Sequence, residues 1–238
     1  MDLAPEGMDP ASFRERGFLV VQDVAPRAGS WARAVLSGEL APVRVELEES
    51  QRALCRGRGS ARSYVFDRFA TDQVIPELEA FYQALLPILA SATGSTWLES
   101  PFARSAYTVK IYQPESCSQG WHVDTNSLTA LLYLTTNAQG GETVIRGLDG
   151  QVHRVRPVAG SLLLMDGVRC EHRAEPVELT PKVVCLLNYY DHHPQRRDLE
   201  MDGLAFGDPP LDQADAGGRG SSGGAASQQA DPGKGDEP

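Results

Sequence analysis

The segment from Ser105 to about Asp191 is a succession of short strand-like stretches, each bounded by residues that favour turns. Many short strands at such close spacing favour a β-sandwich or barrel over a parallel α/β sheet. We therefore predict a mainly β core in this part of the chain. The stretches are SAYTVKIY, LTALLYL, ETVIR, QVHRVR, SLLLMD and KVVCLLNYY.

The first hundred residues combine one strand-like stretch with helical patterns. Phe18 to Val24 is apolar and favours a strand, and residues 30–37 have the spacing of a helix. A longer helical pattern follows, for which we predict Asp72 as the cap, Pro87 as a kink or break and Gly94 as the end. These helices are expected to pack on one outer face of the sheet.

Composition and charge exclude several classes of function. The chain of 238 residues carries 22 basic and 32 acidic side chains, a net charge of −10. Such a field repels phosphate backbones, so no nucleic-acid substrate is expected. The start MDLAPEGMDP lacks a signal-peptide apolar run, and no stretch is apolar enough for a membrane span. Four cysteines without CxxC spacing suit reduced thiols, and we expect a cytoplasmic protein.

Two segments are expected to lie in solvent rather than in the core. Residues 206–238 are rich in glycine and serine, which predicts a disordered tail after a single domain over residues 1–205. A second segment, residues 52–62, is rich in arginine and glycine and is interpreted as a solvated loop that could also close over a site. Its basic residues are Arg52, Arg56, Arg58 and Arg62.

His122, Asp124 and the distant His172 match the 2-His-1-carboxylate set of ligands. On a strand, residues two apart project to the same side, so His122 and Asp124 could hold one ion while Val123 points away. A ligand from a late strand can join two from an early one when a sheet rolls up. This set suits non-haem Fe(II), because it leaves positions open for a co-substrate and O₂.

The alternative is that His122 and His172 are hydrogen-bonded structural histidines. We favour the metal site because both fall in register with the strand pattern together with Asp124. Three further histidines compete as ligands, and all are expected to be solvent-facing. They are His153, His192 and His193.

Residues 105–191 resemble the catalytic core of the 2-oxoglutarate/Fe(II) dioxygenases, most closely the prolyl 4-hydroxylase-type branch. The family fold is a double-stranded β-helix, a cupin-like jelly roll, which we therefore expect as the core behind the N-terminal helices. FRERGFLVVQDV also resembles the opening strand of the family. The matching pieces are His122-Val123-Asp124, Gly140-Gly141-Glu142-Thr143, Pro157-Val158-Ala159-Gly160-Ser161, His172 followed by Glu175-Pro176-Val177, and Lys182.

The resemblance implies an Fe(II) dioxygenase that hydroxylates an unactivated C–H bond and converts 2-oxoglutarate to succinate and CO₂. Its co-substrates would be 2-oxoglutarate and O₂, with ascorbate as a candidate stimulant. Lys182, ten residues after His172, would pair with the distal carboxylate of 2-oxoglutarate, and Tyr112 and Tyr133 would contact the same molecule. Burying that carboxylate requires a fixed cation. An intact Asp124 argues against halogenation, for which related enzymes carry a small residue there.

The substrate is less constrained than the iron site. Candidate contacts are Asn126, Arg169 and Trp121, which lie beside the predicted ligands in the sequence. A free amino acid, a natural-product intermediate and a peptidyl residue all fit this pattern, and the sequence leaves the oligomeric state undetermined. Two other functions stay open: a non-catalytic jelly roll that senses iron or 2-oxoglutarate, and a cupin-like dioxygenase. The latter would leave Lys182 and Gly140-Gly141-Glu142-Thr143 without a role.

Overall fold

The structure is a computed structural model that describes residues 9–38, 42–48, 50–51, 56–57, 61–114, 119–191, 203 and 205. The predicted tail, residues 206–238, lies outside the described residues, as do Cys55, Cys117, His192 and His193. The elements are α1 (Pro10–Arg16), β1 (Phe18–Val21), α2 (Ala28–Leu36), β2 (Val43–Leu47), β3 (Ala61–Phe66), α3 (Arg68–Val74), α4 (Leu78–Ala84), α5 (Leu86–Thr93), β4 (Leu98–Glu99), β5 (Tyr107–Tyr112), β6 (Leu128–Tyr133), β7 (Thr143–Arg146), β8 (Val152–Val155), β9 (Leu162–Asp166), β10 (Glu171–Ala174) and β11 (Lys182–Tyr190).

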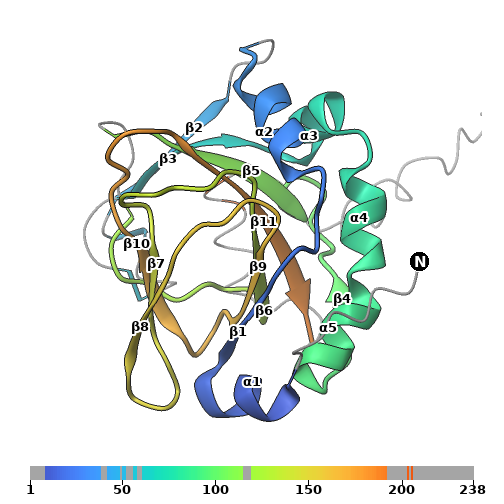
Figure 1. Ribbon diagram of the computed structural model, residues 1–238, viewed down its shortest axis with the longest axis vertical. Helices are drawn as coiled ribbons and strands as arrows, with labels where there is room; N and C mark the ends of the chain where they lie inside the picture. The colour runs from blue at the N-terminus through green and yellow to red at the C-terminus, as the bar shows by residue number, and fades with distance from the viewer. Residues whose placement is uncertain are drawn as a thin grey trace, which may run out of the picture.

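Two antiparallel sheets form the core, and helices cover the outer face of the larger one (Figure 1). The larger sheet has the order β1-β9-β6-β11-β5-β3-β2, with β4 also paired to β11, and the smaller has the order β10-β7-β8. Neighbours in the larger sheet are far apart in sequence, as in a rolled sheet rather than a meander. The predicted jelly-roll fold is confirmed.

The larger sheet is buried on both faces because its strands alternate between two apolar layers. Leu132 and Val183 pack toward the helices, whereas Leu131, Tyr133 and Val184 pack between the two sheets. Every residue of β6 is therefore buried. The space between the sheets, lined by the second set, is where a site can form.

The predicted long helix is wrong, because the structure divides it into α3, α4 and α5. Asp67, rather than Asp72, caps α3: its carboxylate accepts a hydrogen bond of 2.9 Å from the Ala70 N–H. Pro87 lies in the first turn of α5, where its missing N–H costs nothing. Gly94 ends α5 in the left-handed conformation, as predicted.

Part of the segment predicted as a solvated loop belongs to the larger sheet. Arg62 lies in β3 opposite Glu46 of β2, and the two side chains are 3.5 Å apart. The sequence gave no strand signal at either β2 or β3. Arg52 and Arg58 lie outside the described residues, whereas Arg56 donates to the Val168 carbonyl oxygen. Among the helices that the structure describes, none has the length and apolarity of a membrane span.

Candidate metal centre and adjoining pocket

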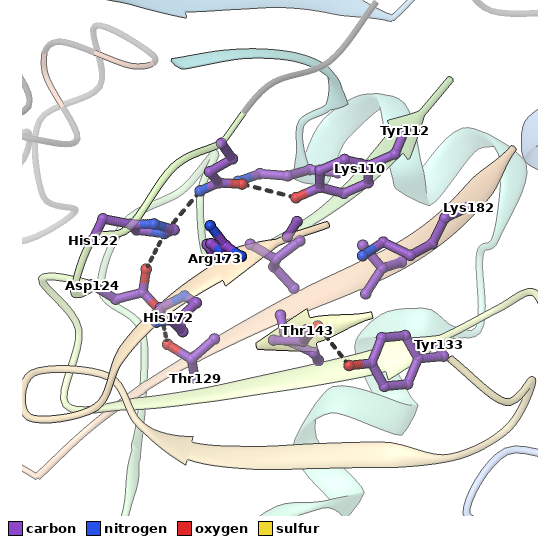
Figure 2. Close-up of a pocket in the computed structure, with 15 residues that line it drawn as sticks. Lys110, Tyr112, His122, Asp124, Thr129, Tyr133, Thr143, His172, Arg173 and Lys182 are labelled. Atoms are coloured by element: carbon purple, nitrogen blue, oxygen red, sulfur yellow. Dashed lines mark hydrogen bonds and ion pairs between the residues drawn. The ribbon is translucent and has the colours of Figure 1, made fainter. Parts of the chain in front are cut away.

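His122, Asp124 and His172 converge at one end of the space between the sheets (Figure 2). The segment of His122 and Asp124 is not a strand, which corrects the predicted reason for their convergence. Instead, His122 forms an isolated antiparallel bridge with His172 of β10, and each N–H donates to the other carbonyl oxygen at 2.9 and 2.8 Å. The Asp124 N–H donates to Gly167 at 2.7 Å. Backbone pairing therefore fixes all three residues.

The three side chains fit a metal ion by donor type and spacing. The Nε2 atoms of His122 and His172 each lie 3.6 Å from a carboxylate oxygen of Asp124, and ligand atoms of all three fall within 4.8 Å of one another. One face of an octahedral ion needs donor separations of about 3 Å, given bonds of about 2.1 Å. Small side-chain rotations close that difference.

Hydrogen bonds orient both imidazoles toward the centre. Nδ1 of His122 lies 2.8 Å from the Gly120 carbonyl oxygen, and Nδ1 of His172 lies 3.1 Å from that of Cys170. A carbonyl only accepts, so each Nδ1 carries the proton and each Nε2 keeps a lone pair for a metal. The Thr129 hydroxyl donates to Asp124 Oδ2 and holds the carboxylate in place.

The protonation states also suit a metal ligand set. Burial, followed by the proximity of His172, lowers the pKa of His122 to about 3, which keeps its imidazole neutral at pH 7. Burial alone would raise the pKa of Asp124, but His172, His122, the Thr129 hydroxyl and Lys110 together lower it below the usual value. Neutral imidazoles beside a carboxylate are the forms that bind a cation.

Gln119 is a neighbour of the triad that the sequence analysis missed. Its Nε2 lies 2.8 Å from Nε2 of His122, and its Oε1 accepts a hydrogen bond of 2.8 Å from the Tyr112 hydroxyl. The lone pair of His122 Nε2 serves either the Gln119 amide or a metal. Metal binding therefore releases this amide donor into the pocket.

A pocket of about 400 Å³, open solvent at its mouth included, extends from the triad between the two sheets. That volume falls in the range of small-molecule sites, which begins at about 300 Å³. The lining combines the triad with polar and apolar side chains of β5, β6, β7, β10 and β11 (Figure 2). Besides the triad it consists of Lys110, Tyr112, Gln119, Thr129, Leu131, Tyr133, Thr143, Arg173, Ala174, Lys182, Val184 and Leu186.

Lys182 lies at the opposite end of the pocket from the triad (Figure 2). It is 1% exposed, its Nζ donates to the Gly141 carbonyl oxygen at 2.8 Å, and the same atom is 4.4 Å from the centre of the Tyr112 ring. A buried ammonium is costly unless it pairs with charge, so this position suits an anion. Tyr133 bonds Thr143 across the sheets at 2.8 Å, which places a second hydroxyl beside it.

Solved structures with the same architecture include enzymes that use iron and 2-oxoglutarate. An oxidoreductase of the 2OG-Fe(II) oxygenase family from Burkholderia pseudomallei matches with a TM-score of 0.58 and 16% identity, over 79% of this chain and 92% of that one. The chain has the fold of the 2-oxoglutarate/Fe(II) oxygenases. No family model matches the sequence, and no curated protein matches it.

Two further structures show how widely chemistry varies on the 2-oxoglutarate/Fe(II) oxygenase fold. A prolyl hydroxylase from Trichoplax adhaerens, solved with a hypoxia inducible factor peptide fragment, matches with a TM-score of 0.58 and 18% identity, over 77% of this chain and 88% of that one. The epimerase SnoN from nogalamycin biosynthesis matches with a TM-score of 0.54 and 15% identity, over 76% and 81%. Similarity at this level establishes the fold and leaves the substrate open.

On this oxygenase fold, the predicted metal and co-substrate residues share one pocket, whereas the predicted substrate residues do not line it. Trp121 lies beside the triad, and the guanidinium carbons of Arg146 and Arg173 are 4.2 and 4.9 Å from its ring centre. Arg169 is a mostly exposed partner of Asp166, 3.6 Å away. Contact of these residues with substrate stays a prediction.

Asn126 supports the site from behind rather than lining it. It is buried, and its Nδ2 donates to the Leu128 carbonyl oxygen at 2.7 Å and to the Thr129 hydroxyl at 2.9 Å. Because Thr129 in turn holds Asp124, the structure places Asn126 in the hydrogen-bond chain behind a ligand. His153, predicted to face solvent, is partly buried instead, bonding Asp149 at 2.9 Å and packing on Phe18.

Proposed function

We propose that the protein is a 2-oxoglutarate-dependent Fe(II) hydroxylase. The observation that carries this is the pairing, within one pocket, of a two-histidine, one-carboxylate set with the buried ammonium of Lys182 at the opposite end. Together they offer what a chelating dicarboxylate needs: a metal for its 2-oxo acid end and a fixed cation for its other carboxylate.

In this proposal, His122, Asp124 and His172 hold Fe(II), and Lys182 binds the distal carboxylate of 2-oxoglutarate, with Tyr112 and Tyr133 beside it. Iron, 2-oxoglutarate and O₂ supply the oxidant, and one oxygen atom enters the substrate as hydroxyl while the other enters succinate, with release of CO₂. The chain's own residues orient the reactants, and Leu131, Val184 and Leu186 keep water from the pocket.

The reacting group is proposed to be an unactivated C–H bond of a small molecule or of a peptidyl residue. The prolyl hydroxylase from T. adhaerens, with its peptide, supports the second class, and SnoN supports the first. The pocket volume favours a compact reacting group in either case.

An anaerobic titration tests the co-substrate site without knowledge of the substrate. Metal-free protein is titrated with Fe(II) and 2-oxoglutarate while the visible charge-transfer band of an iron–2-oxo acid chelate is recorded. The band is expected in the wild type and absent in His172→Ala. His153→Ala is the matched control, because it removes a histidine of the same small sheet that lies outside the triad.

Loss of the band in both histidine variants, or no band in folded wild-type protein, would contradict the proposed metal site. A second readout is succinate formation in air, which should disappear in Asp124→Ala and persist in Asp149→Ala. Unchanged turnover in Asp124→Ala would reject the proposal.

A further inference from the structure

Lys110 is a cation of the pocket that no motif of the sequence accounts for. It lies two residues before Tyr112 on β5, and this spacing directs both side chains into the space between the sheets. On the neighbouring β11, Val184 is opposite Lys110 and Lys182 is opposite Tyr112. The two lysines therefore enter one pocket from adjacent strands.

The two lysines serve different ends of the pocket. Figure 2 shows Lys110 extending toward Gln119 and the His122 side, while Lys182 lies at the other end near Tyr133. Lys182 already suits the distal carboxylate of 2-oxoglutarate. Lys110 lies on the side of the metal ligands, which is where a substrate must approach the iron to react.

The charges of the lining exceed what iron and 2-oxoglutarate need. Among the described lining residues, Asp124 is the one carboxylate, while Lys110, Arg173 and Lys182 are cations. Fe(II) with Asp124 carries one positive charge, and adding Lys182 gives two, which the dianion of 2-oxoglutarate balances. Arg173 pairs with Glu175 at 2.7 Å. The charge of Lys110 therefore makes the loaded pocket attractive to a further anion, on a chain whose net charge is −10.

Gln119 supplies hydrogen-bond donors beside this cation. Its amide nitrogen lies at His122 Nε2 in the metal-free site and is released when a metal takes that lone pair. An ammonium next to an amide N–H is a common recognition pair for a carboxylate. The position of both groups near the triad would fix such a carboxylate close to the iron.

We propose that Lys110, assisted by Gln119, binds a carboxylate of the primary substrate and so makes the protein selective for small carboxylic acids. This inference rests on the proposed hydroxylase function and narrows its substrate class. Lys110 acts as a specificity-determining residue, while iron and 2-oxoglutarate bind through the triad and Lys182.

Equilibrium binding to matched acids and amides tests the inference. The protein is loaded with Zn(II) and 2-oxoglutarate, which prevents turnover, and titrated calorimetrically with hydrocinnamate, isovalerate, cyclopentanecarboxylate and N-acetylproline, each beside its primary amide. A charge-assisted bond exceeds a neutral one by about 1 kcal/mol, so the acids should bind roughly five- to tenfold tighter than the amides.

Lys110→Met should abolish that preference, leaving amide affinities within about twofold and 2-oxoglutarate affinity unchanged. Lys110→Gln serves as a second variant if the first does not fold. Arg62→Met is the matched control, because it removes one cation from the exposed partner of Glu46, outside the pocket lining, and should keep the preference.

Equal affinities for acids and amides in the wild type, including no detectable binding of either, would overturn the inference. A large loss of 2-oxoglutarate affinity in Lys110→Met would also overturn it, because Lys110 would then belong to the co-substrate. The iron–2-oxoglutarate band separates the two levels: its presence with no acid preference refutes this inference alone, whereas its absence refutes the proposed function as well.

Discussion

Replacing Lys182 by methionine should have opposite effects on stability and on co-substrate affinity. Methionine keeps the length of the side chain and removes its charge. The ammonium is 1% exposed, and it donates to the Gly141 carbonyl oxygen. In the metal-free protein the folded state bears the cost of burying this charge, and that cost disappears with the substitution.

The magnitudes follow from these contacts. Loss of the bond to Gly141 costs about 1 kcal/mol, which relief from burying the charge offsets, so the free energy of unfolding should stay within about 1 kcal/mol of wild type or rise. For 2-oxoglutarate, removing the partner of a buried carboxylate costs about 3 kcal/mol, or roughly a 150-fold increase in Kd. Iron affinity should not change, because the triad is intact.

Two assays measure these quantities. Urea unfolding of the metal-free protein gives the stability, and anaerobic titration of the iron–2-oxo acid band gives the Kd for 2-oxoglutarate. Arg62→Met is the control for loss of one positive charge. If Lys182→Met lost more than about 2 kcal/mol of stability while its Kd rose less than about threefold, Lys182 would be structural and the reasoning refuted.

Three further predictions concern the surroundings of the triad. Thr129→Val removes the hydroxyl that holds Asp124 and should weaken iron binding about tenfold to a hundredfold in a competition titration; unchanged affinity would show that Asp124 needs no such support. Gly140→Ala should destabilise the protein by about 3 kcal/mol in urea unfolding, because φ is +70° and a Cβ would lie 2.4 Å from the Pro176 carbonyl oxygen; near-wild-type stability would contradict this. The lowered pKa of His122 means that the unfolded chain takes up this proton first, so metal-free stability should be full above pH 6.5 and decline as pH falls toward about 3. A flat profile over that window in the wild type, or the same decline in His122→Asn, would contradict the assignment.

The local pattern of the sequence predicted the strands and the metal ligands. Strand-like stretches from Tyr107 to Tyr190 coincide with β5 to β11 because alternation and turn residues act over a few positions. His122, Asp124 and His172 were recognisable because three residues of the right chemistry interrupt this apolar pattern.

Errors arose where one local signal competed with another of similar strength. Both Asp67 and Asp72 can cap a helix, and the break at Ile75–Pro76 decided which one does. Asn126 looked like a substrate contact from its position in the sequence, yet its amide is used by Leu128 and Thr129. A side chain's partners are fixed by the backbone that surrounds it, which sequence neighbours do not specify.

By itself, the sequence determined that this chain forms a jelly roll with a two-histidine, one-carboxylate set, because periodicity and ligand chemistry are written in local order. Only the tertiary structure decided what joins that set. The pairing of β5 with β11 brought Lys110 into the pocket of Lys182, and the bridge between His122 and His172 placed Gln119 against a ligand. Strand register between distant segments is set by packing of the whole sheet, so these neighbours appear only once the chain is folded.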